Sequence, residues 1–241
     1  PVAGMTLDLG DAGPQSDGGI RVDSILEDWD MAWLTLRSSG GTESIGIAQI
    51  ESDGSLTPID GAILEGGSSF YTDGVSSPVV VDDGDSLRMF FAGVNGDIYT
   101  IGTATSNDGI TWNIDEEPVL DPELRSNWES NGAIPGSIET DLESGELRLW
   151  YSGHDGDLWN IGTAVQDENG VFRRDSVFEV GSPGEWDDTS VRDPWIVTAD
   201  DADGTPTTWL FYAGFDGEQW QAGLATRSGN ASIFERSWSE R

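Results

Sequence analysis

One unit of about sixty residues occurs four times along the chain, and a repeat of this length restricts the fold more than any other feature of the sequence. The four copies read AWLTLRSSGGTESIGIAQ from Ala32, MFFAGVNGDIYTIGTATS from Met89, LWYSGHDGDLWNIGTAVQ from Leu149 and LFYAGFDGEQWQAGLATR from Leu210. Their shared glycines are Gly46, Gly102, Gly162 and Gly223, which lie 56, 60 and 61 residues apart. We therefore expect four copies of one supersecondary unit.

The second copy shows how one unit folds. Apolar runs at residues 79–81 and 87–91 flank Asp82-Asp83-Gly84-Asp85, a sequence typical of a turn between strands. A tight hairpin at residues 92–97 leads to a third strand at 100–105, and a shorter fourth strand begins near Ile114. Four strands in a repeat of roughly this length are typical of a propeller blade.

We therefore predict an all-β fold, with a single β-propeller domain over residues 1–241 built from four-stranded antiparallel blades. The four visible units span residues 18–65, 70–120, 128–180 and 186–241. Residues 1–17 contain one further predicted strand, at 5–9, which would help to close a ring of either four or five blades. A two-sheet β-sandwich is the alternative fold, but a sandwich gives no reason for the same hairpin to recur at regular spacing.

The charge of the chain excludes several classes of partner. Asp and Glu number 45 against 11 Lys plus Arg, and the formal net charge is -34. Such a charge repels nucleic-acid phosphates and anionic membranes, whereas a neutral sugar or a cation is compatible with it. The chain has no cysteine, and its lack of an 18-residue apolar run argues against membrane insertion. Solubility in an extracellular or cell-surface setting fits this composition, and no signal peptide is visible in the chain.

Three motifs carry a resemblance to a known family. They are ATSNDGITW at residues 104–112, the strand endings MFFAG, LWYSG and LFYAG, and Arg192-Asp193-Pro194. The chain resembles the five-bladed, furanosidase-like propellers of glycoside hydrolase families 43, 32, 62 and 68. The resemblance implies a propeller with a central funnel and a glycan or oligosaccharide as partner. Fold alone does not imply activity.

The resemblance also indicates where catalytic carboxylates would stand. In these families three carboxylates near the starts of innermost strands point into the funnel, and hydrolysis needs at least two carboxyl groups beside the glycosidic bond. Asp193 matches the transition-state stabiliser. The equivalent positions in the other units are Val22, Ser77 and Pro135. Asp23 lies one step from the pattern, and Glu139 is the nearest candidate for the general acid. The candidate catalytic residues are therefore Asp193, Asp23 and Glu139, an incomplete set.

Aromatic and acidic residues recur in the hairpins and in the segments that lead into each innermost strand. Strand alternation places these segments on one rim of a propeller, where rings can stack on sugars and carboxylates can accept hydroxyl hydrogen bonds. The candidate substrate-binding residues are Arg192, Trp128, Glu129, Trp186, Asp187, Asp188, Asp73, His154, Trp159 and Trp220. The alternative interpretation is that the acids form turns and the rings pack within or between blades.

Metal and cofactor sites are weakly indicated. His154 is the only histidine and falls in a hairpin, so we predict no metal site and no cofactor. Asp82-Asp83-Gly84-Asp85 and Asp200-Asp201-Ala202-Asp203-Gly204 resemble fragments of Ca²⁺ loops but lack a complete ligand set.

Three functional hypotheses follow from the sequence. The first is a glycan-binding, glycoside-hydrolase-like propeller without the full hydrolytic set. The second is an active hydrolase with a displaced acid, which would use Asp193 with Glu139 and either Asp23 or Asp73. The third is a structural propeller that makes protein contacts. The sugar, the linkage and the oligomeric state are left open.

Overall fold

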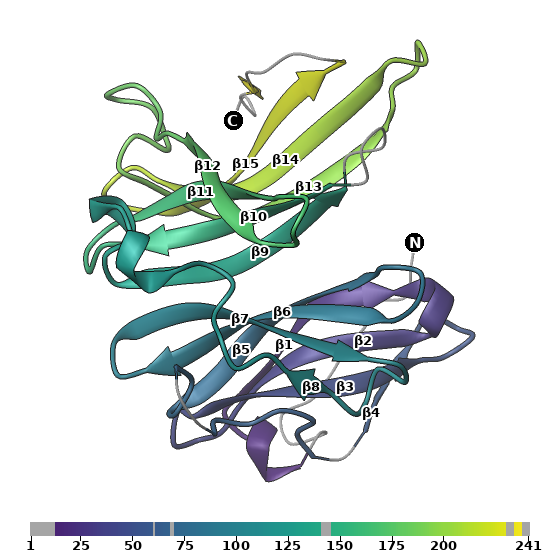
Figure 1. Cartoon of the computed structure of the whole chain (residues 1–241). Helices are drawn as coiled ribbons and strands as arrows, with labels where there is room; N and C mark the ends of the chain where they lie inside the picture. The colour runs from purple at the N-terminus through teal and green to yellow at the C-terminus, as the bar shows by residue number, and fades with distance from the viewer. Residues whose placement is uncertain (1–12, 60, 68–69, 141–145, 230–233, 238–241) are drawn as a thin grey trace. The chain divides into compact units, whose positions relative to one another are not determined.

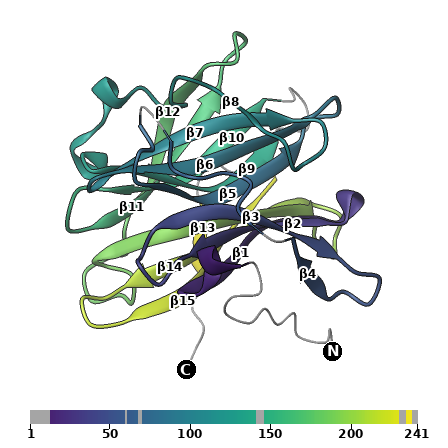
Figure 2. The same ribbon diagram turned by 90° about the horizontal axis from the view of Figure 1, so that it is seen from below.

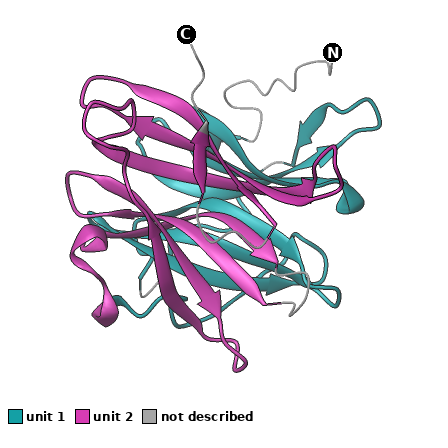
Figure 3. Ribbon diagram, turned by 90° about the horizontal axis from the view of Figure 1, so that it is seen from above, with its two compact units in different colours: residues 1–122 teal, residues 123–241 magenta. Residues whose placement is uncertain are grey.

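The computed structural model describes residues 13–59, 61–67, 70–140, 146–229 and 234–237. The chain divides into two compact units, Pro1–Pro122 and Glu123–Arg241 (Figure 3). Each unit contains two of the four predicted repeats. The short 3-10 helices are η1 (Pro14–Ser16), η2 (Glu27–Trp29), η3 (Pro122–Leu124) and η4 (Asn127–Glu129). The strand predicted at residues 5–9 lies outside the described residues.

The first unit contains two antiparallel blades in which each strand pairs with the next along the chain (Figure 1). The first blade is β1 (Gly19–Leu26), β2 (Met31–Arg37), β3 (Glu43–Ile50) and β4 (Leu56–Pro58). The second blade is β5 (Gly74–Asp82), β6 (Leu87–Asn95), β7 (Ile98–Ser106) and β8 (Asn113–Ile114).

The second unit repeats this arrangement, and Figure 2 shows its strands β13, β14 and β15 side by side. The third blade is β9 (Gly132–Thr140), β10 (Leu147–His154), β11 (Trp159–Gln166) and β12 (Phe172–Phe178). The fourth blade is β13 (Ser190–Asp200), β14 (Pro206–Phe215), β15 (Trp220–Ser228) and β16 (Glu235–Ser237). The predicted fold class, four-stranded antiparallel blades of a propeller, is confirmed. No helix among the described residues has the length and apolarity needed to cross a bilayer.

The core of each unit forms between its two blades. In the first unit Trp33 and Ile47 of the first blade pack with Val80 and Phe91 of the second, and all four are buried. In the second unit Trp150 of the third blade packs with Ile196 and Leu210 of the fourth. The innermost strand of the later blade therefore lies on the face of the earlier blade in both units. This stacking removes large aromatic and branched side chains from water, which is the main favourable term in folding.

The ATSNDGITW motif forms the turn between β7 and β8. The Asp108 carboxylate accepts hydrogen bonds from the backbone N–H groups of Thr111 and Ile110. These bonds lower the pKa of Asp108 to about 2. Gly109 adopts φ 74°, and its carbonyl accepts from the indole of Trp33 on the first blade. The motif is therefore a structural turn that joins two neighbouring blades.

Candidate functional site

Each of the four innermost strands contains a β-bulge at the position where the sequence predicted a catalytic acid. The register with the second strand skips Asp23 in β1, Ser77 and Pro78 in β5, and Asp193 and Pro194 in β13, and it shifts beside Pro135 in β9. Bulges re-aim side chains and occur next to functional sites. The strand register makes the same four residues equivalent as the sequence repeats do, namely Val22, Ser77, Pro135 and Asp193.

Asp193 is the bulge residue best placed to meet a ligand. Its backbone lies in the left-handed region at φ 57°, and Ser77 at the equivalent position has φ 54°. Such conformations are costly for residues other than glycine and concentrate at functional sites. The Asp193 backbone N–H donates to Ser152 Oγ at 2.9 Å, and its side chain is 66% exposed. Arg192 Nε lies 3.3 Å from Asp193 Oδ2. The Asp193 backbone is thus fixed by a hydrogen bond, while its side-chain carboxylate is accessible to a ligand.

Asp23, in contrast, lies within a hydrogen-bond network of the first unit. Its Oδ2 accepts from the backbone N–H of Thr35 at 2.8 Å and from the Thr35 hydroxyl at 2.7 Å, and Arg21 pairs with Oδ1. Arg21 also donates to the Ser77 hydroxyl at 2.8 Å. Burial raises the pKa of Asp23, and the adjacent Arg21 opposes that change. The carboxylate is only 11% exposed. Asp23 therefore links the first two bulges to each other.

Glu139 is enclosed by cations. Its Oε1 accepts from Arg227, and its Oε2 accepts from the Trp150 indole at 3.2 Å and lies 3.8 Å from Arg148 Nε. It stands four residues beyond Pro135 on the same strand, which corresponds to about 13 Å at the usual rise. The structure corrects the expectation of a displaced general acid here, because both oxygens are occupied and the residue lies far along β9 from the bulge.

The acids that follow Trp128 and Trp186 are also buried. Glu129 and Asp187 are 0% exposed, and they pair with Arg174 on β12 and with Arg236 on β16. The Tyr212 hydroxyl donates to Asp187 Oδ2 at 2.7 Å. Burial, followed by this hydrogen bond, raises the pKa of Tyr212. The expectation that Glu129 and Asp187 bind substrate was wrong, since each carboxylate holds the outermost strand of its own blade.

The repeat glycines explain the position of the two tryptophans. A Cβ on Gly162 would lie 2.5 Å from the Trp128 ring, and a Cβ on Gly223 would lie 2.1 Å from the Trp186 ring. Trp128 also stacks on Tyr151, with ring centroids 5.8 Å apart. The glycines recur because the aromatic ring must lie directly on the backbone. Trp128 and Trp186 were expected to line the substrate site, and the structure instead packs them against their own blades.

Four predicted residues form one continuous stack on the hairpins of the second unit. His154 stacks on Trp159 at 4.3 Å, and the Arg192 guanidinium lies 6.0 Å from the Trp159 ring and 4.1 Å from the Trp220 ring. Trp220 then stacks on Phe215 at 5.0 Å. His154, Trp159, Arg192 and Trp220, which are all candidate substrate-binding residues, lie together in this stack, and Trp220 is 39% exposed.

Asp193 and Trp220 lie in one depression on the fourth blade, with a volume of about 410 Å³. Its lining residues are Asp193, Trp195, Phe211, Tyr212, Ala213, Trp220, Gln221 and Ala222. The lining is mainly aromatic, and Gln221 Nε2 is a buried donor without a hydrogen-bond partner. Aromatic walls with a few polar groups, in a volume of several hundred Å³, are typical of ligand sites. Sequence reasoning missed Trp195, Phe211 and Gln221, although the alternation of β13 and β14 placed the two aromatics on one face.

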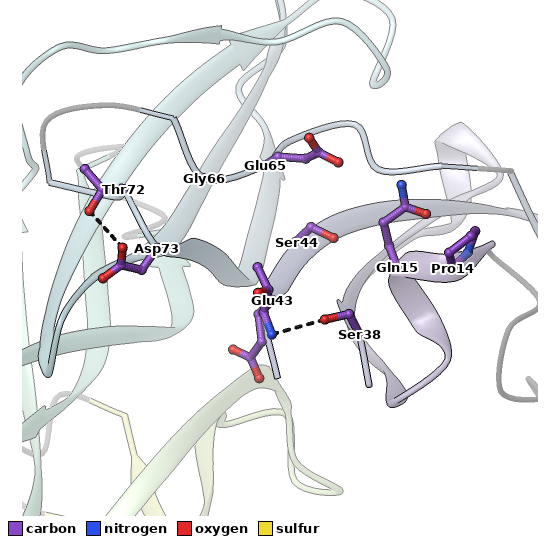
Figure 4. A pocket seen from close by; sticks show the side chains of 10 residues that line it. Pro14, Gln15, Ser38, Glu43, Ser44, Glu65, Gly66, Thr72 and Asp73 are labelled. Atoms are coloured by element: carbon purple, nitrogen blue, oxygen red, sulfur yellow. Dashed lines mark hydrogen bonds between the residues drawn. The ribbon is translucent and has the colours of Figure 1, made fainter. Parts of the chain in front are cut away.

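A second depression, of about 380 Å³, lies in the first unit and includes Asp73. Figure 4 shows the Asp73, Glu43 and Glu65 carboxylates among hydroxyl groups, with the Thr72 hydroxyl donating to Asp73. Asp73 also accepts from the Gly96 backbone N–H at 2.7 Å, which closes the neighbouring hairpin. No aromatic side chain is among the residues described as lining this depression.

The remaining predicted acids serve turns. Asp188 accepts from the Gly184 backbone N–H at 2.6 Å, and Asp201 accepts from the N–H groups of Asp203 and Thr205. Asp82 accepts from the Gly84 N–H in the same way. In the described part of the chain, no group of three or more acidic or histidine side chains is placed to hold a metal ion.

The comparisons with known proteins concern the fold. The sequence matches no protein-family model and no curated protein. Among solved structures, a thermostable family-43 glycoside hydrolase matches with a TM-score of 0.70 at 13% identity, over 95% of this chain and 76% of that chain. This chain has the propeller fold of those hydrolases. The resemblance inferred from ATSNDGITW and the strand endings is confirmed at the level of fold.

Two further structures extend the comparison. An endo-arabinase from Bacteroides thetaiotaomicron matches with a TM-score of 0.62 at 13% identity, over 96% of this chain and 83% of that chain. A β-1,2-mannobiose phosphorylase from Listeria innocua, solved with β-1,2-mannobiose, matches with a TM-score of 0.62 at 17% identity, over 88% of this chain and 61% of that chain. Identities this low show a shared glycoside-hydrolase-like propeller and leave the activity to the site itself.

Proposed function

We propose that this chain binds a neutral glycan in the depression of the fourth blade, with Asp193 and Trp220 as its principal contacts. The observation that carries the proposal is the exposed Asp193 carboxylate, held on a strained bulge in the same depression as an exposed indole. The propeller fold shared with carbohydrate-acting enzymes supports a sugar as the ligand class.

The chemistry of the depression fits a sugar. The apolar face of a pyranose or furanose can lie on the Trp220 ring, while the Asp193 carboxylate accepts hydrogen bonds from hydroxyl groups. Arg192 lies against both Trp220 and Asp193, so it fixes the orientation of the two main contacts. The net charge of -34 disfavours anionic ligands, which is why the proposal specifies a neutral glycan.

The same positions favour binding over hydrolysis. A glycosidase needs two carboxyl groups, roughly 5–9.5 Å apart across the scissile bond. At the register positions equivalent to Asp193 the chain has Val22, Ser77 and Pro135, none of which is an acid, and Asp23, the acid in the β1 bulge, is held by Arg21 and Thr35. Asp193 is the one carboxylate among the described residues that line the fourth-blade depression. We therefore propose a binding protein without the full hydrolytic set.

Calorimetric titration with neutral arabinan- and mannan-derived oligosaccharides tests the proposal. Binding by the wild-type chain should weaken about tenfold in Trp220→Ala, since removal of a central aromatic contact commonly costs more than about 1 kcal/mol. Asp193→Asn should also weaken binding, because a carboxylate is a stronger acceptor for hydroxyl groups than an amide.

Asp203→Asn is the matched control for Asp193→Asn. Asp203 lies on the same blade in the exposed turn between β13 and β14, and its removal changes the net charge equally. Binding that is equal in Asp193→Asn, Asp203→Asn and wild type would reject the site. Release of sugar from a panel of aryl-furanosides and aryl-pyranosides, abolished by Asp193→Ala, would replace the binding proposal with the hydrolase hypothesis.

A further inference from the structure

The fourth blade has an unusual outer face. Trp195 is 62% exposed, and Phe211, its pairing partner on β14, is 39% exposed. Their ring centroids lie 5.6 Å apart. Register places Phe215 and Trp220 on this same face, because side chains two residues apart along a strand point to one side. The face therefore carries two aromatic pairs, in which Trp195, Phe211 and Trp220 are exposed and Phe215 is half-buried.

The corresponding faces of the first and third blades are covered by a strand of the next blade, and the contact uses hydroxyl acceptors. On the first blade Ser24 accepts from the Val80 N–H at 3.0 Å, and Thr35 accepts from the Ser77 N–H at 2.9 Å. On the third blade the equivalent acceptors are Ser137 and Ser152, which receive the N–H groups of Ile196 and Asp193 at 3.1 and 2.9 Å. When a blade packs on such a face, two backbone N–H groups at and beside its bulge therefore donate to two hydroxyl groups of the blade below.

The fourth blade lacks both acceptors. Pairing opposite Phe211 places Trp195 at the position of Ser24 and Ser137, and Ala213 stands at the position of Thr35 and Ser152. A strand docked here would leave two backbone N–H groups without the partners that the other faces provide, and an unpaired buried group is costly. The exposed aromatic pair therefore suits a ligand better than another blade.

Loss of the hydroxyl groups is not sufficient by itself. The second blade has Val79 and Ala92 at the two positions, and Ala92 is fully buried. What distinguishes the fourth blade is the exposed Trp195 ring at the first of these positions, together with the open Asp193 carboxylate in the same depression. Asp193 lies in the depression that the Trp195–Phe211 pair and Trp220 border.

We infer that this face binds an oligosaccharide that extends from Trp220 to the Trp195–Phe211 pair, which makes chain length the specificity determinant of the site. This inference rests on the proposed function. The two pairs stand four residues apart along β14, about 13 Å at the usual rise. A monosaccharide on Trp220 cannot reach Trp195, whereas an extended chain can stack one sugar on each pair. The ligand class is a neutral oligosaccharide of several residues.

Affinity as a function of ligand length tests the inference. Wild-type protein is titrated with disaccharides and pentasaccharides of the arabinan and mannan series. The pentasaccharide should bind at least about tenfold more tightly, and Trp195→Ala should remove that advantage by weakening pentasaccharide binding far more than disaccharide binding. Val197→Ala is the matched control, because Val197 lies two residues away on the same strand, is 36% exposed and is not aromatic.

The outcomes separate the two proposals. If the wild type binds neither the disaccharides nor the pentasaccharides, the proposed function fails. If both lengths bind equally, or if Trp195→Ala weakens both lengths alike, glycan binding stands and the extended site is rejected. Light scattering of the protein as it elutes from a size-exclusion column gives a third measurement, the oligomeric state. A dimer that Trp195→Asp converts to monomer would show that a second copy covers this face, which would overturn the inference.

Discussion

The buried ion pair between Arg174 and Glu129 provides the sharpest test of how the third blade is held together. Arg173 and Arg174 are neighbours on β12, yet their surroundings differ. Arg174 is 19% exposed and pairs with Glu129, which is 0% exposed, whereas Arg173 is 70% exposed and pairs with Asp167 at the surface. The two arginines form an internal comparison of a buried and an exposed ion pair.

We expect Arg174→Met to destabilise the chain by about 3 kcal/mol and Arg173→Met by less than about 1 kcal/mol. Removing one partner of a buried pair leaves an uncompensated buried charge, which typically costs 3–5 kcal/mol, whereas surface pairs contribute roughly 0–1 kcal/mol. The lower end of this range, about 3 kcal/mol, applies to Arg174→Met because a second cation, Arg125, also lies near Glu129. Burial and then the charge of Arg174 lower the pKa of Arg125, and Glu129 opposes that change.

Urea unfolding of the two variants measures the difference, and thermal melts repeat it. For a chain of this length, about 3 kcal/mol corresponds to a fall of roughly 6–12 °C in Tm. The double variant Glu129→Gln/Arg174→Met should recover part of the loss, because it removes the unpaired charge as well. Equal free energies of unfolding for Arg173→Met and Arg174→Met would refute the reasoning.

Three further predictions concern single positions. Gly162→Ala should destabilise the third blade by about 1–3 kcal/mol, because a Cβ there lies 2.5 Å from the Trp128 ring, while Gly40→Ala, with no atom closer than 3.7 Å, should be neutral in the same melts. Because the pKa of Asp108 is lowered, its contribution to stability is present above the ordinary value of 3.8 and is lost as the pH falls toward 2. In Asp108→Asn the urea midpoint should therefore change less with pH over this interval than it does in the wild type, and a pH dependence equal to that of the wild type would contradict this. Asp193→Gly should abolish glycan binding without loss of Tm, because relief of a left-handed φ, about 1 kcal/mol, offsets the added chain entropy of glycine; a clear fall in Tm would show that the carboxylate is structural.

The sequence was a good guide to the blades because their signals are local. The spacing of Gly102, Gly162 and Gly223 reflects a contact made within one blade, where an aromatic ring lies on the backbone. The turn at Asp108 is likewise formed by atoms a few residues apart. The positions that the alignment of the four units makes equivalent lie at the bulges of the innermost strands, and Asp193 and Ser77 share a register position and a left-handed backbone.

The sequence was a poor guide to which acids and aromatics are exposed. An acid that follows an aromatic has the same local pattern at Trp128-Glu129 and in any ligand rim. Only the approach of Arg174, 45 residues away, shows that Glu129 is a buried partner. The exposure of Trp195 could not be predicted either, because it depends on whether another strand lies on that face of the blade.

The repeat by itself determined the all-β class and the four strands of each unit. The tertiary structure decided which of the predicted residues can meet a ligand, because burial depends on contacts between strands that are distant along the chain. It moved Glu129, Asp187 and Glu139 into ion pairs and left Asp193 and Trp220 open. The physical reason is that turns and strand pairs are encoded over a few residues, whereas the environment of a carboxylate is set by whatever the fold packs against it.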